Sequence, residues 1–277
     1  MAFNLDQIEK NLCTNFLGKA SVANELWDEI GSTNDRALEL AKAGADEGVF
    51  VLARSQSGGR GRQGKSWISR PDSGIFMSIL LRPTLPPADI PLISLAAGVA
   101  VSEALENICS IKAGLKWVND IVINGKKLGG ILAEMHGSQT ASAGKILLPA
   151  VIVGIGINLT NDRESLPDDL KDKVTSVSEH SNIEPEPNAI VAEIINCLEG
   201  QYNSLLHAVP ELVLEEWKRR SVTIGKHIRA TAGDGNVDGE AINITNSGAL
   251  ILKTETGDER ILHAGEISIR LSDGTYA

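Results

Sequence analysis

Cysteines and basic residues are both scarce in this chain of 277 residues. Its three cysteines, Cys13, Cys109 and Cys197, lie far apart, and the sequence has no C-x-x-C pair and no histidines at metal-ligand spacing. This pattern disfavours a zinc site and predicts incidental thiols in a reducing compartment. Acidic residues outnumber basic ones by 36 to 26, for a formal net charge of -10. A chain with this charge has no overall cationic field for nucleic acid, so we expect no nucleic-acid binding.

Long hydrophobic runs are also missing. No apolar run reaches the roughly 18 residues that would span a bilayer. The N-terminal segment, with Asp6 and Glu9, has no apolar core of a signal peptide. We therefore expect no membrane association and a cytoplasmic location. Hydrophobic residues still make up 42% of the chain, which is enough to bury a core of ordinary size.

Helical and strand patterns alternate over residues 1–221, which we expect to form one domain. Ser32 and Asp35 fit a capping box, and Gly44 suits the left-handed position that ends a helix. Helices are predicted over residues 5–17, 32–44, 88–108, 188–207 and 210–220. Strands are predicted over 48–57, 74–83 and 145–158, with a hairpin in 114–137 and a charged loop over 160–187. Asn124-Gly125 marks the hairpin turn as type I′.

The residue pattern of the sequence changes at about Val222. Four or five short strand patterns, separated by Gly, Asp and Asn turns, follow over about fifty residues. We expect residues 222–277 to form a small SH3-like β-barrel. The predicted fold class is α+β, with a mixed, largely antiparallel sheet packed with helices in the larger domain.

The segment "GGRGRQGKSW", Gly58–Trp67, matches the phosphate-binding P-loop pattern G-x-x-x-x-G-K-[ST]. A genuine P-loop joins a strand to a helix, whose N-terminus and backbone N–H groups hold the phosphates. Here Pro71 and Gly74 follow closely, and strand residues come after them. No helix can begin there, so we reject the P-loop interpretation.

Positive charge is nevertheless concentrated around this segment. Residues 54–70 include five basic residues and no acid: Arg54, Arg60, Arg62, Lys65 and Arg70. On an acidic protein this concentration predicts an anionic ligand that neutralises the loop. The glycines make the loop easy to deform, and Arg60 and Arg62 supply planar guanidinium groups that suit carboxylate and phosphate. The sequence therefore predicts a flexible lid over a small anion.

Four motifs in the same order resemble those of biotin protein ligases: "STND", "GRGRQGKSW", "KWVNDIVINGKKLGGILAE" and "VGIGINL". The resemblance covers about residues 28–272. It implies a catalytic domain of the class II synthetase or biotin-lipoate ligase type, and a reaction in two steps. Biotin and ATP would give biotinyl-5′-AMP and diphosphate, and the biotinyl group would then pass to a carrier lysine. Too few residues precede Ser32 for the N-terminal helix-turn-helix of repressor members, so we expect the non-repressor type.

The resemblance also implies which residues form the site. Lys127 corresponds to the lysine that contacts the biotin carboxylate and the α-phosphate, and Arg62 belongs to the lid; with Asp120 they form the expected catalytic set. The expected biotin-binding residues are Ser32, Thr33, Asn34, Gln56, Arg60, Gly61, Arg62, Lys127, Gly129 and Gly130. The expected ATP and adenylate residues are Arg60, Arg62, Trp67, Asn119, Lys127 and Asn158. In the C-terminal unit, Arg229 and Arg270 are the candidate contacts.

Several roles stay open from the sequence alone. Asp120 is a candidate to bind Mg²⁺, to orient Lys127 or to assist the acceptor lysine. Ser32 and Asn34 could be helix caps, and Trp67 could be a core aromatic. The family's usual "KWPND" is "KWVND" here, with Val118, and Gln63 removes one cation from the loop; the effect of Gln63 on adenylate retention stays open.

The resemblance implies ATP and Mg²⁺ as cofactors, with Mg²⁺ bridging phosphates and no certain protein ligand. Biotin is the implied substrate. The implied protein partner is the biotin carboxyl carrier domain of acetyl-CoA carboxylase or of another biotin-dependent carboxylase, and a homodimer is left open. Two alternatives remain: a lipoate- or octanoate-protein ligase, and a biotin-sensing protein without turnover.

Overall fold

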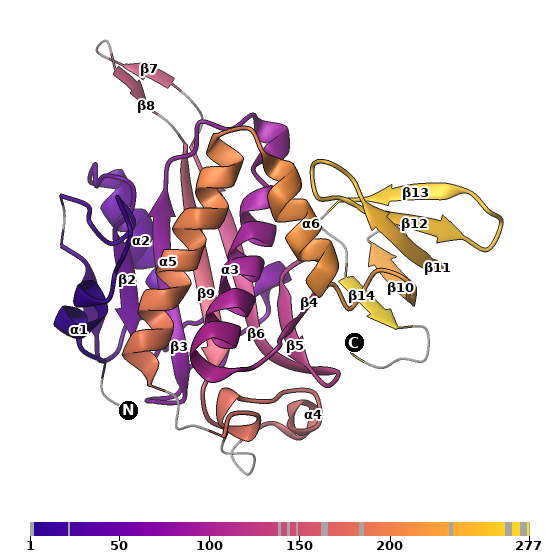
Figure 1. Cartoon of the computed structure of the whole chain (residues 1–277), viewed down its shortest axis with the longest axis horizontal. Helices are drawn as coiled ribbons and strands as arrows, with labels where there is room; N and C mark the ends of the chain where they lie inside the picture. The colour runs from indigo at the N-terminus through magenta and orange to yellow at the C-terminus, as the bar shows by residue number, and fades with distance from the viewer. Residues whose placement is uncertain are drawn as a thin grey trace.

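A seven-stranded sheet forms the centre of the computed structural model (Figure 1). The order across the sheet is β1 (Glu25–Trp27), β2 (Phe50–Ala53), β3 (Gly74–Leu81), β9 (Ala150–Asn158), β6 (Lys126–His136), β5 (Asp120–Ile123) and β4 (Gly114–Lys116). Strands β1 and β2 pair in parallel, and every other neighbouring pair is antiparallel. The expected mixed, largely antiparallel sheet is confirmed. The structure describes residues 3–21, 23–137, 140–142, 145–147, 149–161, 166–182, 186–232, 235–263, 268–271 and 276.

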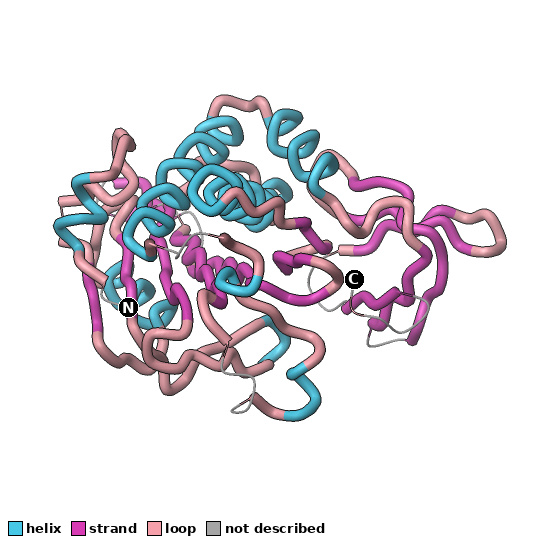
Figure 2. Tube along the Cα trace, turned by 60° about the horizontal axis from the view of Figure 1, so that its bottom comes forward, coloured by secondary structure: helices cyan, strands magenta, loops and turns pink. Residues whose placement is uncertain are grey.

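Helices cover both faces of this sheet, as Figures 1 and 2 show. The helices are α1 (Leu5–Lys10), α2 (Thr33–Lys42), α3 (Leu92–Cys109), α4 (Asp168–Lys171), α5 (Pro187–Leu206) and α6 (Pro210–Arg220). Because side chains alternate along a strand, Val51 and Leu80 pack with α2 in one buried cluster. Their neighbours Leu52 and Ile79 pack with α3 and α5 in the other cluster. Helix α2 therefore has its own face, opposite α3.

The predicted hairpin turn and several predicted elements are confirmed. Asn124 and Gly125 have φ values of 49° and 75°, as a type I′ turn requires. Gly44 ends α2 with a φ of 91°. Helices α5 and α6 and strand β3 differ from their predicted ranges by few residues.

Other boundaries were predicted wrongly. The strand predicted over residues 145–158 is divided into β8 (Lys145–Leu147), which pairs with β7 (Thr140–Ser142), and β9. The loop predicted over 160–187 contains α4. The first helix ends at Lys10, although a helix over 5–17 was predicted.

Tertiary hydrogen bonds explain the early end of α1. The carboxylate of Glu199, on α5, accepts the backbone N–H groups of Asn15, Phe16 and Leu17 at 2.6, 3.0 and 2.9 Å. Glu199 is only 4% exposed. One buried carboxylate therefore satisfies three backbone donors, and this holds the segment in a non-helical conformation against the core.

We expect Glu199→Ala to lower the free energy of unfolding by about 3 kcal/mol, because three backbone N–H groups lose a charged acceptor. Urea denaturation measures the change. Glu211→Ala, at an exposed position near the start of α6, is the matched control and should change stability by less than about 0.5 kcal/mol. Equal effects of the two substitutions would contradict the anchoring role of Glu199.

One sequence-based exclusion needs correction. Pro87–Cys109, which includes α3, is long and apolar enough to cross a membrane by length and composition, although we expected no such segment. Within the structure, 67% of its apolar window is buried, because α3 packs between the sheet and the helices α5 and α6. Its composition is accounted for by its central place in the core.

The C-terminal unit is a five-stranded antiparallel sheet, as expected from the strand patterns. Its order is β13 (Glu259–Leu262), β12 (Leu250–Thr254), β11 (Gly235–Ile244), β10 (His227–Ala232) and β14 (Ser268–Leu271). Trp117 joins it to the larger unit, since its backbone N–H donates to Thr223 at 2.9 Å and its indole donates to the Gly248 carbonyl at 3.0 Å. The apolar residues of both units form one continuous core. The C-terminal unit therefore lies against the β4 end of the central sheet.

Candidate active site

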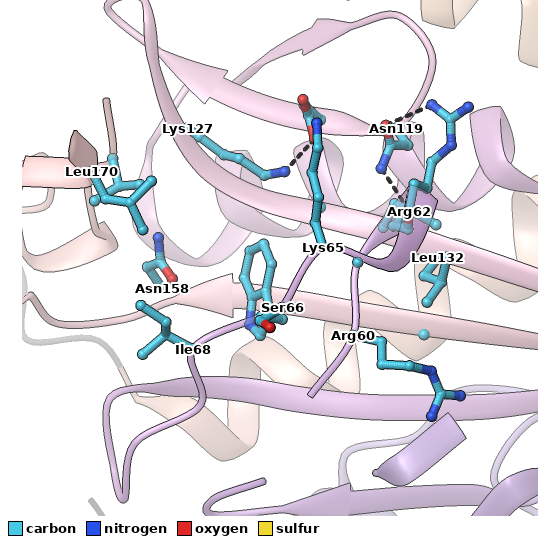
Figure 3. Close-up of a pocket in the computed structure, with 18 of the residues that line it drawn as sticks. Arg60, Arg62, Lys65, Ser66, Ile68, Asn119, Lys127, Leu132, Asn158 and Leu170 are labelled. Carbon is cyan, nitrogen blue, oxygen red and sulfur yellow. Dashed lines mark hydrogen bonds and ion pairs between the residues drawn. The ribbon is translucent and has the colours of Figure 1, made fainter. Parts of the chain in front are cut away.

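A cavity of about 720 Å³ lies over β6 and β9. Its walls come from the start of α2, from residues 56–73, from the β4–β5 connection and from the C-terminal unit. Figure 3 shows the part formed by the loop and the central strands. The sheet thus brings together segments that are far apart in the sequence.

Glycines on β9 make the floor of this cavity. A Cβ atom at Gly154 would lie 2.3 Å from the side-chain oxygen of Asn34, and one at Gly156 would lie 2.7 Å from the ring of Trp67. Asn34 and Trp67 therefore rest directly on the backbone. The alternation in "GIGIN" carries this arrangement: glycines face the cavity while Ile155 and Ile157 enter the core.

Polar side chains gather at the N-terminus of α2. The backbone N–H of Thr33 donates to the side-chain oxygen of Gln56 at 2.8 Å, and Ser78 donates to Asn34 at 2.6 Å. Asn34 in turn donates to Glu134 at 2.7 Å. Since these side chains are fixed by one another, they form a preorganised polar wall.

The predicted capping box at this helix is wrong. Ser32 is at the N-cap position, but its side chain makes no capping hydrogen bond. Gln56 satisfies the helix N-terminus instead, and Asp35 is bound by Arg60. Ser32 lines the cavity, and its ligand-binding role stays a prediction.

The glycine-rich loop does not have P-loop geometry. Arg62–Gly64 form a single 3₁₀ turn, Arg60 pairs with Ser66 in an isolated bridge, and the next regular element is β3. No helix follows Ser66 before Gly74, in a stretch that the structure describes completely. Rejecting the P-loop interpretation from Pro71 and Gly74 was correct.

Some of the loop cations already have partners within the protein, and the expected external anion stays a prediction. Arg54 forms a 2.9 Å ion pair with Asp72. Arg60 donates two hydrogen bonds to Asp35, both of 2.7 Å, and this pairing lowers the pKa of Asp35. Acids outside the loop therefore neutralise part of its charge, which the sequence of the loop could not indicate.

Arg62 differs from Arg60 in its surroundings. Its Nη1 donates to the side-chain oxygen of Asn119 at 3.3 Å, while its Nη2 is buried and has no hydrogen-bond partner among the described residues. Burial lowers the pKa of Arg62. In Figure 3 the side chain of Arg62 turns toward Asn119, whereas that of Arg60 points away. Asn119 is itself fixed, because its amide donates to the Ile131 carbonyl at 2.9 Å.

Lys127 and Asp120 form the charged centre of the cavity. Their ion pair measures 2.5 Å, and the Lys127 ammonium lies 5.3 Å from the centre of the Trp67 ring. Burial acts most strongly and would raise the pKa of Asp120, but Lys127, Tyr276 and Lys116 together hold that pKa below its ordinary value. The backbone of Lys127 also pairs with the segment around Val174, which fixes the start of β6.

Two further residues enter the site that the sequence analysis did not select. Lys116, only 4% exposed, lies with its ammonium 3.7 Å from the centre of the Tyr276 ring. Burial lowers its pKa to about 7. Tyr276 donates a hydrogen bond to Asp120, and Arg270 lies 4.9 Å from the same ring. The lysine of "KWVND" was a visible signal, whereas nothing in the sequence brings position 276 to the cavity.

We expect Lys116→Met to stabilise the fold most at or below neutral pH. Lys116 has a pKa of about 7 in the folded state and 10.5 as its ordinary value. Between these values the unfolded chain binds more protons, so the cost of burying Lys116 falls as pH rises through that window. Urea denaturation at about pH 6 and about pH 10 tests this, with the exposed Lys112→Met as control. If the difference in the free energy of unfolding between Lys116→Met and the wild type were the same at both pH values, this prediction would be contradicted.

Unsatisfied donors indicate what the cavity binds. Among the described residues, four buried side-chain polar atoms have no hydrogen-bond partner, and three of them line this cavity: Arg62 Nη2, Trp67 Nε1 and Lys116 Nζ. All three are donors, so the missing partner is rich in acceptor atoms. Eight lining residues are Lys or Arg and two are Asp. The cavity therefore suits a polyanionic ligand, although the chain as a whole is acidic.

The structure brings together nearly all the residues expected at the site. Those that line the cavity are Ser32, Thr33, Asn34, Gln56, Arg60, Gly61, Arg62, Trp67, Asn119, Asp120, Lys127, Gly130 and Asn158. Gly129 does not, because a Cβ there would lie 2.6 Å from Ile157 on the core side of β6. Arg229 does not either; it pairs with Asp238 on the C-terminal sheet. Arg270 does line the cavity.

The fold and the site define a class of ligase. Residues 27–158 match the Biotin/lipoate A/B protein ligase family, and residues 223–270 match the Biotin protein ligase C terminal domain. The chain belongs to the biotin protein ligase family: it is 37% identical over 238 residues to the bifunctional ligase/repressor BirA of Bacillus spizizenii. That match covers 86% of this chain and 71% of the relative.

Other relatives are consistent with this assignment. The biotin–[acetyl-CoA-carboxylase] ligase of Mycobacterium tuberculosis is 31% identical over 271 residues, and 94% of each chain is covered. A solved structure of the biotin protein ligase from Aquifex aeolicus in complex with biotin and ATP has a TM-score of 0.75 and 27% identity. It covers 91% of this chain and all of that chain.

Proposed function

We propose that this chain catalyses ATP-dependent biotinylation of a carrier protein in two steps. Biotin and ATP give biotinyl-5′-AMP and diphosphate, and the biotinyl group then passes to a lysine of a biotin carboxyl carrier domain. The observation that carries this proposal is the set of unsatisfied buried donors around Lys127, in a cavity rich in cations. The relatives named as biotin ligases support the choice of substrate.

Two groups of side chains in the cavity suit the two substrates. The polar wall at α2, with Thr33, Asn34 and Gln56, offers neutral donors and acceptors that suit the ureido group of biotin. Arg62 and Lys116 offer unsatisfied donors for the phosphates of ATP. Trp67 rests on β9 in the same cavity. We assign the biotin carboxylate to the neighbourhood of Lys127, beside Trp67.

The first step must bring two anions together. The biotin carboxylate attacks the α-phosphorus of ATP, and diphosphate leaves. No covalent enzyme nucleophile is needed, so catalysis consists of positioning and of stabilising negative charge. Lys127 is suited to this because Asp120 fixes its ammonium in place. Arg62 adds a donor that is already desolvated and therefore needs little reorganisation.

The second step requires an acceptor amine to lose a proton. Asp120 is the carboxylate at the centre of the cavity, and its pKa is held low, so it is ionised at neutral pH. It can attract the acceptor ammonium and orient it toward the acyl carbon. We therefore assign Asp120 a supporting role in transfer, in addition to its pairing with Lys127.

Mg²⁺ fits this site only as an ion held mainly by the substrate. Among the described residues no three His, Cys, Asp or Glu side chains are placed to hold a metal. Both oxygens of Asp120 have partners in Lys127 and Tyr276. Mg²⁺ commonly retains waters and binds phosphate oxygens, and when bound it would neutralise charge on the phosphates.

A cytoplasmic location and the absence of nucleic-acid binding remain predictions.

Diphosphate exchange into ATP tests the first step and separates the alternatives. We expect exchange that depends on biotin and not on lipoate or octanoate. Exchange that depends only on lipoate would favour a lipoate ligase, and biotin binding without exchange would favour a sensor. The match to the Biotin protein ligase C terminal domain favours the biotin reaction.

A further inference from the structure

Tyr276 is hydrogen-bonded to Asp120, the carboxylate that we assign to the transfer step. Its hydroxyl donates to Oδ2 of Asp120, while Lys127 holds Oδ1 of the same carboxylate at 2.5 Å. The side chain of Asp120 is only 15% exposed. Each oxygen of Asp120 therefore already has a partner in a largely buried site, and an incoming ammonium must compete with these two partners.

The ring of Tyr276 is held by cations as well. Lys116 lies 3.7 Å from its centre and Arg270 lies 4.9 Å from it. Cations near the face of an aromatic ring attract it, most strongly when they are shielded from water. The ammonium of Lys116 has no hydrogen-bond partner among the described residues, so its contact with the ring face does not compete with a hydrogen bond. Tyr276 is thus fixed at the edge of the cavity by its hydroxyl and by its ring.

Of the two partners, Tyr276 is the one suited to leave. Lys127 is part of β6 and is tied to the neighbouring segment on both sides of its peptide unit, by hydrogen bonds of 2.8 Å to Lys173 and Thr175. Its charge is also required in the first step. The phenol of Tyr276 is neutral, because burial raises its pKa. An acceptor ammonium is positive, so it is the better partner for a carboxylate and can displace the phenol.

We propose that Tyr276 is a specificity-determining residue for the acceptor, which shields Asp120 from small amines and admits only a lysine whose carrier domain contributes binding energy to displace it. This inference rests on the proposed function and concerns which acceptor amine is used in the second step. A small amine makes contacts only through its own ammonium, so these contacts alone must supply the free energy that displaces Tyr276 from Asp120. A carrier domain can supply part of that free energy through the rest of its interface.

The chemistry of transfer is unchanged by this shield. The acceptor ammonium gives one proton to Asp120, and its nitrogen lone pair forms a bond to the acyl carbon of biotinyl-5′-AMP. The bond between that carbon and the phosphate oxygen breaks, and AMP leaves with the electron pair. The nitrogen loses its second proton to solvent water, which leaves the neutral amide. Tyr276 takes no part in these steps; it controls which amine reaches Asp120.

The test supplies purified biotinyl-5′-AMP and compares two acceptors, Nα-acetyl-lysine and an apo carrier domain. The readout is the ratio of the two transfer rates. Tyr276→Phe keeps the ring beside Lys116 and removes the hydroxyl, and we expect it to raise the ratio in favour of the small amine about tenfold, the size of one charge-assisted hydrogen bond. Tyr276→Ala should raise it at least as much. Lys253→Ala, at an exposed position on β12, is the control.

A ratio that stays within about twofold of the wild type in both Tyr276 variants, or that falls, would overturn this inference. Its failure is distinguishable from failure of the proposed function. If the wild-type protein does not transfer biotin to the carrier at all, the proposed function fails. If the wild type transfers biotin and the ratio does not respond to Tyr276, only the shielding role fails. Loss of folding in the alanine variant leaves the phenylalanine variant to decide.

Discussion

Lys127→Met should lower the rate of biotinyl-5′-AMP formation by about 10²- to 10³-fold. Removing one preorganised donor from a desolvated site typically has an effect of this size. Lys127 is such a donor, since Asp120 fixes its ammonium at 2.5 Å. The substitution also leaves Asp120 without its cationic partner, which further disfavours an anionic substrate nearby. Single-turnover formation of the adenylate measures the effect directly.

Lys126→Met is the matched control for this prediction. Lys126 is the preceding residue on β6 and does not line the cavity. Its replacement should leave adenylate formation within about twofold of the wild type. If Lys127→Met kept a tenth or more of the wild-type rate while remaining folded, Lys127 would not be the central cation of the reaction.

Arg62→Ala should release biotinyl-5′-AMP about 10 to 100 times faster, as expected for the loss of one charged hydrogen bond to the ligand. The buried Nη2 of Arg62 has no partner among the described residues, so it is available to the adenylate phosphate. Escaped adenylate acylates exposed lysines without selection. The variant should therefore label bystander proteins with biotin, which a streptavidin blot detects.

Arg60→Ala is the informative comparison, because it removes the same charge two residues away. Both guanidinium hydrogen bonds of Arg60 already go to Asp35. We expect a smaller increase in adenylate release than in Arg62→Ala. Retention of the adenylate by Arg62→Ala as tight as that of the wild type would show that the lid assignment is wrong.

The local patterns of the sequence predicted much of the fold because they reflect short-range physics. Strand alternation, the positive φ at Asn124 and Gly125 and the rejection of a helix after Ser66 depend on neighbouring residues alone. The early end of α1 depends on Glu199, far away in the sequence. Tertiary hydrogen bonds of this kind override local helical propensity.

The candidate site shows the same division. The motifs identified a set of residues that the sheet does bring together around one cavity. The pairing of Arg60 with Asp35, the unsatisfied ammonium of Lys116 and the position of Tyr276 depend on how separate segments meet. Gly129 and Gly130 are adjacent in one motif, yet only Gly130 faces the cavity. The motifs therefore predicted which segments form the site. The direction in which each residue faces determines which of them line the cavity.

Mass spectrometry of an apo carrier domain tests the central claim most directly. The protein is incubated with the carrier, biotin, ATP and Mg²⁺, and the mass of the intact carrier is measured. We expect a gain of one biotinyl group at a single lysine, lost when either biotin or ATP is left out and lost in Lys127→Met. A carrier that keeps its mass in the complete mixture, or gains a lipoyl group in place of biotin when both acids are present, would contradict the account.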